Sequence, residues 1–466
     1  MKYHYSNDSR RINYTIWTSF LKEVITMDFK VVDDCLIIPE GVKIVFDVKP
    51  RKLGPFTKVK FSSTVESVDK RAFKNCKRVE KIELNEGLKV IGIGAFEGCA
   101  ALREINFPKS LTVIQAQAFK NCSSLKKVEL FGEVQELVGE TFSECKSLEE
   151  FIWHSSKSVL IGTASFYGCE ALKIVELPPL RALGDGSFCR CKSLESIKLD
   201  GFFEEIPSKC FAYCSSLKKL QLPKRLKLIM SAAFMSCVSL DKLPPLLNVE
   251  TVREEAFKNC ISLKEIALPS LTVSIGKGCF QDCKSLRHFE FTEKVFFNTA
   301  ECFSGCSSLK NVKLSKDSKS IAFRMFSRCY SLESIEIPNT VRKIQTSAFK
   351  ECRTLREVVI PDSVYEIGKY CFNGCENLEI VEVSNNLPLV ESTAFRGCSV
   401  VGKLIFRDTG DWIPISFVEE SIENAKAKAI GITKLYDAVQ LAFPEEFVAC
   451  NYSNKEVYEI EETNLF

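Results

Sequence analysis

A four-residue signature, Phe followed by two variable residues and Cys, recurs through most of the chain and constrains its fold more than any other feature. Its fifteen copies begin at Phe73, Phe96, Phe119, Phe142, Phe166, Phe188, Phe211, Phe234, Phe257, Phe280, Phe303, Phe326, Phe349, Phe372 and Phe395. Successive copies lie 23 residues apart, except for one step of 24 followed by one of 22. Self-similarity at a fixed short period indicates stacked repeats rather than several independent globular domains.

Each repeat has the same internal order, which the unit after Cys352 illustrates. Apolar and mostly polar residues alternate through Val358 to Ile360, which predicts a short strand. Pro361 follows and ends it, because proline has no amide hydrogen to donate to a neighbouring strand. The segment with a small residue, Phe, two variable residues and Cys predicts a tight helical or 3₁₀ turn. One such unit cannot bury its own apolar side chains, so stacking of neighbours must build a continuous core.

These motifs resemble the BspA-type leucine-rich repeat family, whose pattern is Leu-x-x-Ile-x-Leu-Pro, then Leu-x-x-Ile, then Ala-Phe-x-x-Cys. The resemblance covers residues 34–406. It implies a β-rich leucine-rich-repeat horseshoe, a repeat solenoid with a parallel sheet on its concave face and short helical or 3₁₀ turns opposite. It also implies a binding role, often at the surface of bacteria and protists, and no shared catalytic residues.

The repeat register predicts three regions. Residues 1–33 lie outside the pattern as an N-terminal extension, residues 34–406 form the solenoid, and residues 407–466 form a C-terminal cap. We expect the cap to be partly helical. Val418, Ile422, Ala425 and Ala429 are spaced as one face of a helix that Gly431 would end, and Leu435 to Phe443 suggests a second helix.

Composition excludes several functions. The chain has 63 basic and 60 acidic residues, and this balance creates no long-range field that would favour nucleic acid or anionic membranes. Three histidines, at positions 4, 154 and 288, are too few for the common histidine-based metal and catalytic sites. We find no combination of nucleophile, base and orienting residue, and no apolar run long enough to span a membrane. We therefore expect a non-enzymatic protein without cofactor, metal or transmembrane segment.

The 22 cysteines allow three interpretations. Four of them precede a signature Phe and create Cys-x-x-x-Cys pairs, at 210/214, 279/283, 302/306 and 371/375, which could suggest metal binding. Other copies place Ala, Ser, Thr or Met in the same slot, which favours a size-limited core position instead. Stacked cysteines could form disulfides, but fifteen is an odd number and their side chains should all point one way. We therefore expect buried, free thiols and a reducing, cytoplasmic compartment.

Strand residues that alternate with the core positions should project from the concave face. Two rows of mainly polar side chains result, and they fit either a protein-binding surface or simply a solvated face. The residues that we assign to the binding surface are Lys127, Glu129, Glu150, Lys219, Gln221, Glu265, His288, Glu290, Asn311, Lys313, Glu336 and Glu357. The rows hold no aromatic residue, which argues against sugars and single-stranded nucleic acid. The expected partner is a protein and the expected state is a monomer. The alternative function is a cell-surface adhesin of the BspA type, exported without a cleaved signal peptide.

Two places break the regular pattern. The steps of 24 and 22 residues bracket Cys145 to Phe188, so stacking must be perturbed there and then restored. Pro244 and Pro245 replace strand residues in the middle of the solenoid, where they cost hydrogen bonds to the neighbouring strand.

Overall fold

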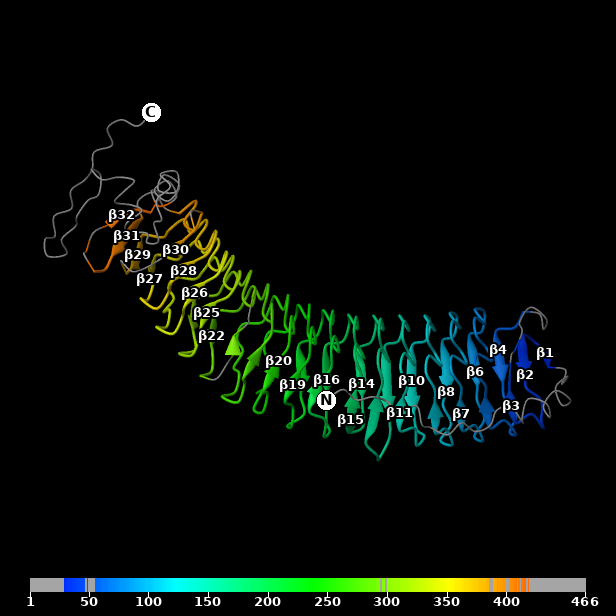
Figure 1. The fold of residues 1–466 in the computed structure, drawn as a ribbon. Helices are drawn as coiled ribbons and strands as arrows, with labels where there is room; N and C mark the ends of the chain where they lie inside the picture. Colours follow the sequence, from blue (N-terminus) through cyan, green and yellow to red (C-terminus); the bar gives the residue numbers. More distant parts are fainter. Residues whose placement is uncertain are drawn as a thin grey trace, which may run out of the picture.

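The computed structural model describes residues 29–418, apart from 47, 49–54, 294–295, 298–299, 385–388, 392, 399–401, 409, 411 and 416–417. These residues form one long, bent stack of coils, and each turn of the chain packs against the turns before and after it (Figure 1). The expected β-rich leucine-rich-repeat solenoid is confirmed.

The longer strands form one face of the solenoid, which we call the long-strand face. Most neighbours pair in parallel with a regular offset, and pairing is interrupted between β8 and β10, β14 and β16, β18 and β22, and β24 and β27. For example, Lys81 pairs with Glu104, and Lys58 pairs with Lys81. The strands are β2 (Cys35–Ile37), β4 (Lys58–Lys60), β6 (Lys81–Glu83), β8 (Glu104–Asn106), β10 (Lys127–Leu130), β12 (Glu150–Trp153), β14 (Ile174–Glu176), β16 (Ser196–Lys198), β18 (Lys219–Gln221), β22 (His288–Glu290), β24 (Asn311–Lys313), β27 (Glu357–Val359), β29 (Ile380–Val383) and β31 (Lys403–Phe406).

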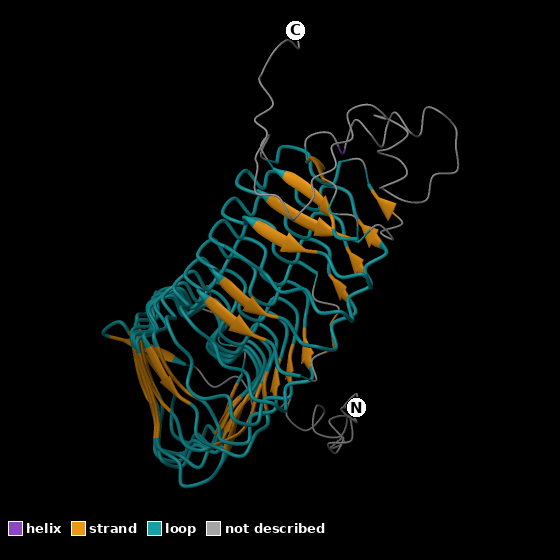
Figure 2. Ribbon diagram, turned by 90° about the vertical axis from the view of Figure 1, so that its left-hand side faces the viewer, coloured by secondary structure: helices purple, strands orange, loops and turns teal. Residues whose placement is uncertain are grey.

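A second set of strands, mostly of two residues, forms another parallel face that the sequence did not predict (Figure 2). It comprises β3 (Ile44–Val45), β5 (Ser67–Val68), β7 (Val90–Ile91), β9 (Val113–Ile114), β11 (Glu136–Leu137), β13 (Val159–Ile161), β15 (Leu180–Leu183), β17 (Glu205–Ile206), β19 (Leu228–Ile229), β20 (Thr251–Val252), β21 (Ser274–Ile275), β23 (Phe296–Phe297), β25 (Ser320–Ile321), β26 (Lys343–Ile344), β28 (Glu366–Ile367) and β30 (Leu389–Val390). We call it the short-strand face.

The expected helical or 3₁₀ turn at the Phe-x-x-Cys segment is wrong: the described repeats contain no helix there. Arg71 and Asn75 have φ angles of 58° and 60°, so left-handed residues interrupt the chain before a helix can propagate. Alternate amides, including that of Phe73, donate to carbonyls of the next coil, while the amides between them bond three residues back. The turns therefore form a third hydrogen-bonded ladder along the solenoid.

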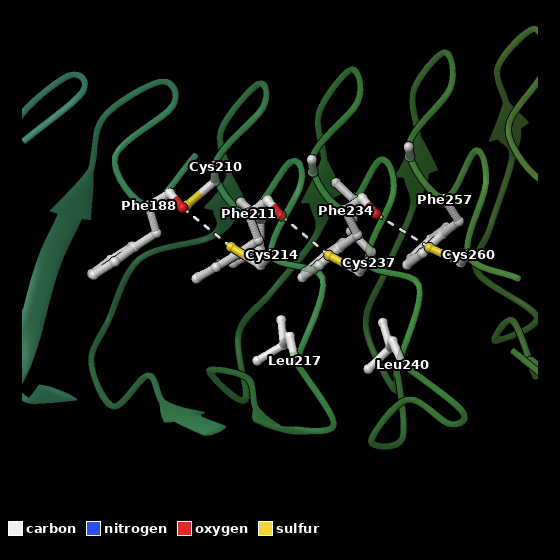
Figure 3. Packing of buried hydrophobic residues seen from close by; sticks show 14 of the residues in the cluster. Phe188, Cys210, Phe211, Cys214, Leu217, Phe234, Cys237, Leu240, Phe257 and Cys260 are labelled. Carbon is white, nitrogen blue, oxygen red and sulfur yellow. Dashed lines mark hydrogen bonds between the residues drawn. The ribbon is translucent and has the colours of Figure 1, made fainter. Parts of the chain in front are cut away.

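Phenylalanine rings fill the core beside this ladder. All fifteen signature rings stack in one column, with neighbouring centroids 5.1–5.9 Å apart and ring planes within 16° of parallel. Each signature thiol from Cys99 onward lies 3.1–3.3 Å from the main-chain oxygen of the Phe in the preceding coil, to which it donates (Figure 3). The cysteines thus tie successive coils together while they fill space.

The steps of 24 and 22 residues affect the short-strand sheet differently. At the longer step β11 pairs with β13 without irregularity, as Leu137 with Ile161 shows. At the shorter step the pairing of β13 with β15 shifts register between Val159 and Leu160, as a β-bulge does. The rings of Phe142 and Phe166 are 5.9 Å apart at the longer step, and those of Phe166 and Phe188 return to 5.1 Å. The sheet irregularity therefore falls at the shorter step, while the core column continues through both steps.

An antiparallel strand covers each end of the long-strand sheet. β1 (Lys30–Val32) pairs with β2 at the start, and β32 (Trp412–Pro414) pairs with β31 at the end. Ile413, Ile415 and Val418 beyond the last repeat are buried. The helices expected after Val418 lie outside the described residues.

Candidate functional site

The twelve residues proposed to bind a partner all lie on the long-strand face. Ten of them are exposed, and Glu129 and Glu150 are half-buried. Residues between them in each strand point inward, as Val128 and Val358 do. The alternation inferred from sequence therefore holds wherever these strands form.

Most of the earlier residues of this set already pair with neighbouring side chains. The Lys127 ammonium lies 3.6 Å from the carboxylate of Glu129 and 3.5 Å from that of Glu150, and His154 contacts Glu129 at 3.1 Å. Gln221 donates a hydrogen bond of 2.9 Å to Asp200. Exposed pairs of this kind contribute little to stability, but they leave few charges free for a partner.

Five of the later residues line one hollow of about 1120 Å³, which we call the groove: Glu265, His288, Glu290, Asn311 and Lys313. Within it, the Lys313 ammonium pairs with the carboxylate of Glu290, and the Asn311 amide lies 3.4 Å from the His288 ring nitrogen. The structure thus brings together residues that are up to 48 positions apart in the sequence.

The groove opens where two consecutive coils of the long-strand face lack a strand. β18 pairs only with β16 and β22 only with β24, and the two coils between them, through 242–246 and 265–269, contain no strand. Pro244 and Pro245 explain the first of these losses, because neither can donate a main-chain hydrogen bond. The short-strand sheet continues unbroken through β19, β20 and β21, and so does the ring column, with Phe234 and Phe257 5.4 Å apart. The long-strand sheet therefore opens here, while the short-strand sheet and the turn ladder hold the coils in place.

Two smaller hollows continue along the same face. One, of about 620 Å³, lies between the coils of Asn311 and Glu336, and the other, of about 400 Å³, is lined by Glu336, Glu357 and Arg407. Arg407 is held by Asp362 at 2.8 Å, whereas Glu336 and Glu357 form no ion pair with any described residue.

Sequence reasoning missed the apolar rim of the groove. Leu271 lines the groove and is 54% exposed, in the segment that follows the strand position, and Leu243, Ile266 and Leu268 are only partly buried. The signal was present in the sequence, since Leu271 stands where the preceding and following coils have Asn248 and Lys294. Reading only the strand positions overlooked it.

The cysteines that the structure describes form no candidate catalytic or metal centre. In the described part of the chain no three His, Cys, Asp or Glu side chains gather as metal ligands, and the 21 cysteines there are free. Burial raises the pKa of Cys145 and of Cys260 to about 12, so both remain protonated at neutral pH. Protonated, buried thiols are poor nucleophiles and poor ligands.

We therefore expect thiol titration of the native protein without reductant to detect few reactive groups, and titration after denaturation to detect about 22. Denaturation exposes the thiols and returns their pKa to an ordinary value, which is why the count should rise. Recovery of far fewer thiols after denaturation would show that disulfides are present and would contradict this interpretation.

Among the described residues, no helix has the length and apolar character that crossing a bilayer requires.

Comparison with known proteins agrees with the geometry. Overlapping segments 51–160, 140–245, 229–356 and 348–425 match the family model described as BspA type leucine rich repeat region. Comparison with curated protein sequences found no match.

Solved structures show similar chains. A leucine-rich repeat protein from Bacteroides ovatus is 25% identical, with 80% of this chain and 89% of that one covered and a TM-score of 0.57. A leucine rich cell surface protein from Faecalibacterium prausnitzii is 21% identical over 81% of this chain and 88% of its own, with a TM-score of 0.40. A leucine-rich repeat protein from Eubacterium ventriosum is 20% identical over 79% and 92%, with a TM-score of 0.42. Because the family model spans residues 51–425 of 466, the chain belongs to the BspA-type leucine-rich repeat family.

Proposed function

We propose that this protein is a non-enzymatic interaction scaffold that binds a partner protein on the later coils of the long-strand face. The observation that carries the proposal is the loss of strands from two consecutive coils between β18 and β22, where the groove lies. Interaction sites commonly combine a recess, exposed apolar side chains and a polar rim, and all three meet here.

The charges along these coils favour a basic partner. Glu265, Glu293, Glu336 and Glu357 form no ion pair with any described residue, whereas Lys242 and Lys316 are the unpaired bases lining the same hollows. Four free carboxylates against two free ammonium groups leave a local excess of negative charge. Such an excess speeds the approach of a positively charged surface, and salt screens the effect.

Reversing two of these charges tests the proposal. We expect Glu336→Lys with Glu357→Lys to slow association with the partner by on the order of tenfold at low salt and to flatten its salt dependence. Glu290 is a poorer choice for substitution, because Lys313 already neutralises it. The partner would first be isolated by pull-down from lysate and, separately, from the cell-surface fraction, and rates would then be measured by surface plasmon resonance.

The matched control reverses two exposed acids on the other sheet, Glu205→Lys with Glu250→Lys, which changes the net charge equally. We expect this control to bind like the wild type. If the control pair slows association and the Glu336 and Glu357 pair does not, the binding surface lies elsewhere on the solenoid.

The pull-down also distinguishes the scaffold from a cell-surface adhesin, because the partner comes either from the lysate or from the cell-surface fraction. A BspA-type surface adhesin should capture its ligand from an extracellular or host-cell surface and should itself be labelled on intact cells by a membrane-impermeant biotin reagent. A scaffold in a reducing compartment should do neither.

A further inference from the structure

The main chain in the groove carries polar groups that no neighbouring coil satisfies. The amides and carbonyls of Glu265, Ile266, Ala267 and Leu268 make no hydrogen bond to any residue that the structure describes, and neither do those of Leu243. In an intact pair such as β16 with β18, the equivalent groups bond to the adjacent coil. None of these five residues is fully buried, so the unpaired groups are open to solvent or to a ligand.

The free edges of the flanking strands add to this array. β18 has no sheet partner on the groove side, and β22 has none on its own groove side. Unpaired strand edges of this kind are the usual template for pairing with another polypeptide segment. The groove therefore presents alternating donors and acceptors over several consecutive residues, a pattern that an extended main chain can match.

The side chains around these groups are mainly apolar. Leu243, Ile266 and Leu268 lie beside the unpaired main chain, and Leu271 lines the groove at its rim. Glu265 and Glu293 stand among them without an ion pair. A ligand that fits must offer apolar side chains, main-chain hydrogen bonds and a positive charge together.

We propose that the groove binds an extended polypeptide segment of the partner, held by main-chain hydrogen bonds to the 265–268 coil and by apolar side chains packed on Leu243, Ile266 and Leu271. This deepens the proposed function and rests on it. An extended peptide that adds to a sheet gains affinity from main-chain hydrogen bonds and specificity from pockets for alternate side chains. A basic residue in the segment would face Glu265 and Glu293.

A phage-displayed library of random 12-residue peptides, selected on the full chain, provides the probe. We expect selected peptides to be rich in apolar and basic residues and to crosslink to the 265–271 segment. Methylation of single main-chain nitrogens in a selected synthetic peptide should weaken binding by about tenfold at every second position, because each methyl group removes one hydrogen bond. Uniform small effects along the peptide would overturn main-chain recognition.

Closing the groove is the complementary test. Pro244→Gln with Pro245→Leu gives this coil the residues Gln221 and Leu222 of the preceding one, and so restores the missing donors. We expect the variant to unfold at a higher urea concentration than the wild type and to lose binding of the selected peptide by at least about tenfold. The higher urea midpoint would show that loss of binding does not come from misfolding.

The matched control changes the other Pro-Pro pair, Pro178→Gln with Pro179→Leu, which follows strand β14 and lies outside the groove. It should bind the peptide like the wild type. A groove-closed variant that folds and still binds the peptide would overturn the inference. If that variant also binds the whole partner normally while the Glu336 and Glu357 reversal weakens binding, the proposed function stands and only this inference fails.

Discussion

Replacing Phe349 with Ala should lower the free energy of unfolding by about 3–5 kcal/mol. The ring is fully buried and lies between the rings of Phe326 and Phe372, at centroid distances of 5.5 and 5.3 Å. Its removal leaves a cavity that the neighbouring coils cannot close, because main-chain hydrogen bonds between the coils fix their spacing. Urea-induced unfolding followed by circular dichroism measures the change.

The control is the same substitution at Phe202, whose side chain is 72% exposed. Phe202→Ala should change the free energy of unfolding by no more than about 0.5 kcal/mol, because little apolar surface leaves a packed environment. Equal effects at Phe349 and Phe202 would show that the column of rings does not hold the solenoid together.

Deletion of residues 407–466 should make the protein aggregate. β32 pairs with β31 and covers the last coil, and it carries the buried side chain of Ile413 onto the core near Leu404 and Phe406. Without it, an unpaired strand edge and two core residues face the solvent, and solenoids depend on terminal caps to avoid this. Size-exclusion chromatography with light scattering should show oligomers or precipitate.

A shorter deletion separates the parts of this region. Removal of 419–466 leaves β32, Ile415 and Val418 in place, and we expect that protein to remain monomeric. If the 407–466 deletion is also monomeric and as stable as the full chain, then the segment is a separate module rather than a cap.

The repeat made the architecture predictable because one 23-residue pattern specifies both the core positions and their stacking. Phe-x-x-Cys identified the ring column, and strand alternation placed Glu290 and Glu357 on the surface. The short-strand face escaped prediction because two-residue strands such as Val90–Ile91 carry almost no local signal and exist only through their neighbours.

The turn and the groove were harder to predict from the sequence, for different reasons. The small-Phe-x-x-Cys pattern resembles a 3₁₀ turn, and only the backbone angles of residues such as Asn75 show that left-handed residues divide it. Pro244 and Pro245 marked a defect, but the opening extends into the 265–268 coil, whose sequence Glu-Ile-Ala-Leu reads as an ordinary strand. The number of coils that lose strand hydrogen bonds beside such a defect depends on how adjacent coils pack. The sequence of one repeat does not specify that packing.

Site-specific photocrosslinking tests the binding proposal most directly. A photoreactive amino acid would replace Ala267, in the groove, or Lys350, on the turn ladder, and each full-length variant would be irradiated with the isolated partner. We predict an adduct from position 267, lost when unlabelled partner competes, and none from position 350. An adduct from position 350 with none from position 267 would contradict the account and would move the binding site to the Phe-x-x-Cys side of the solenoid.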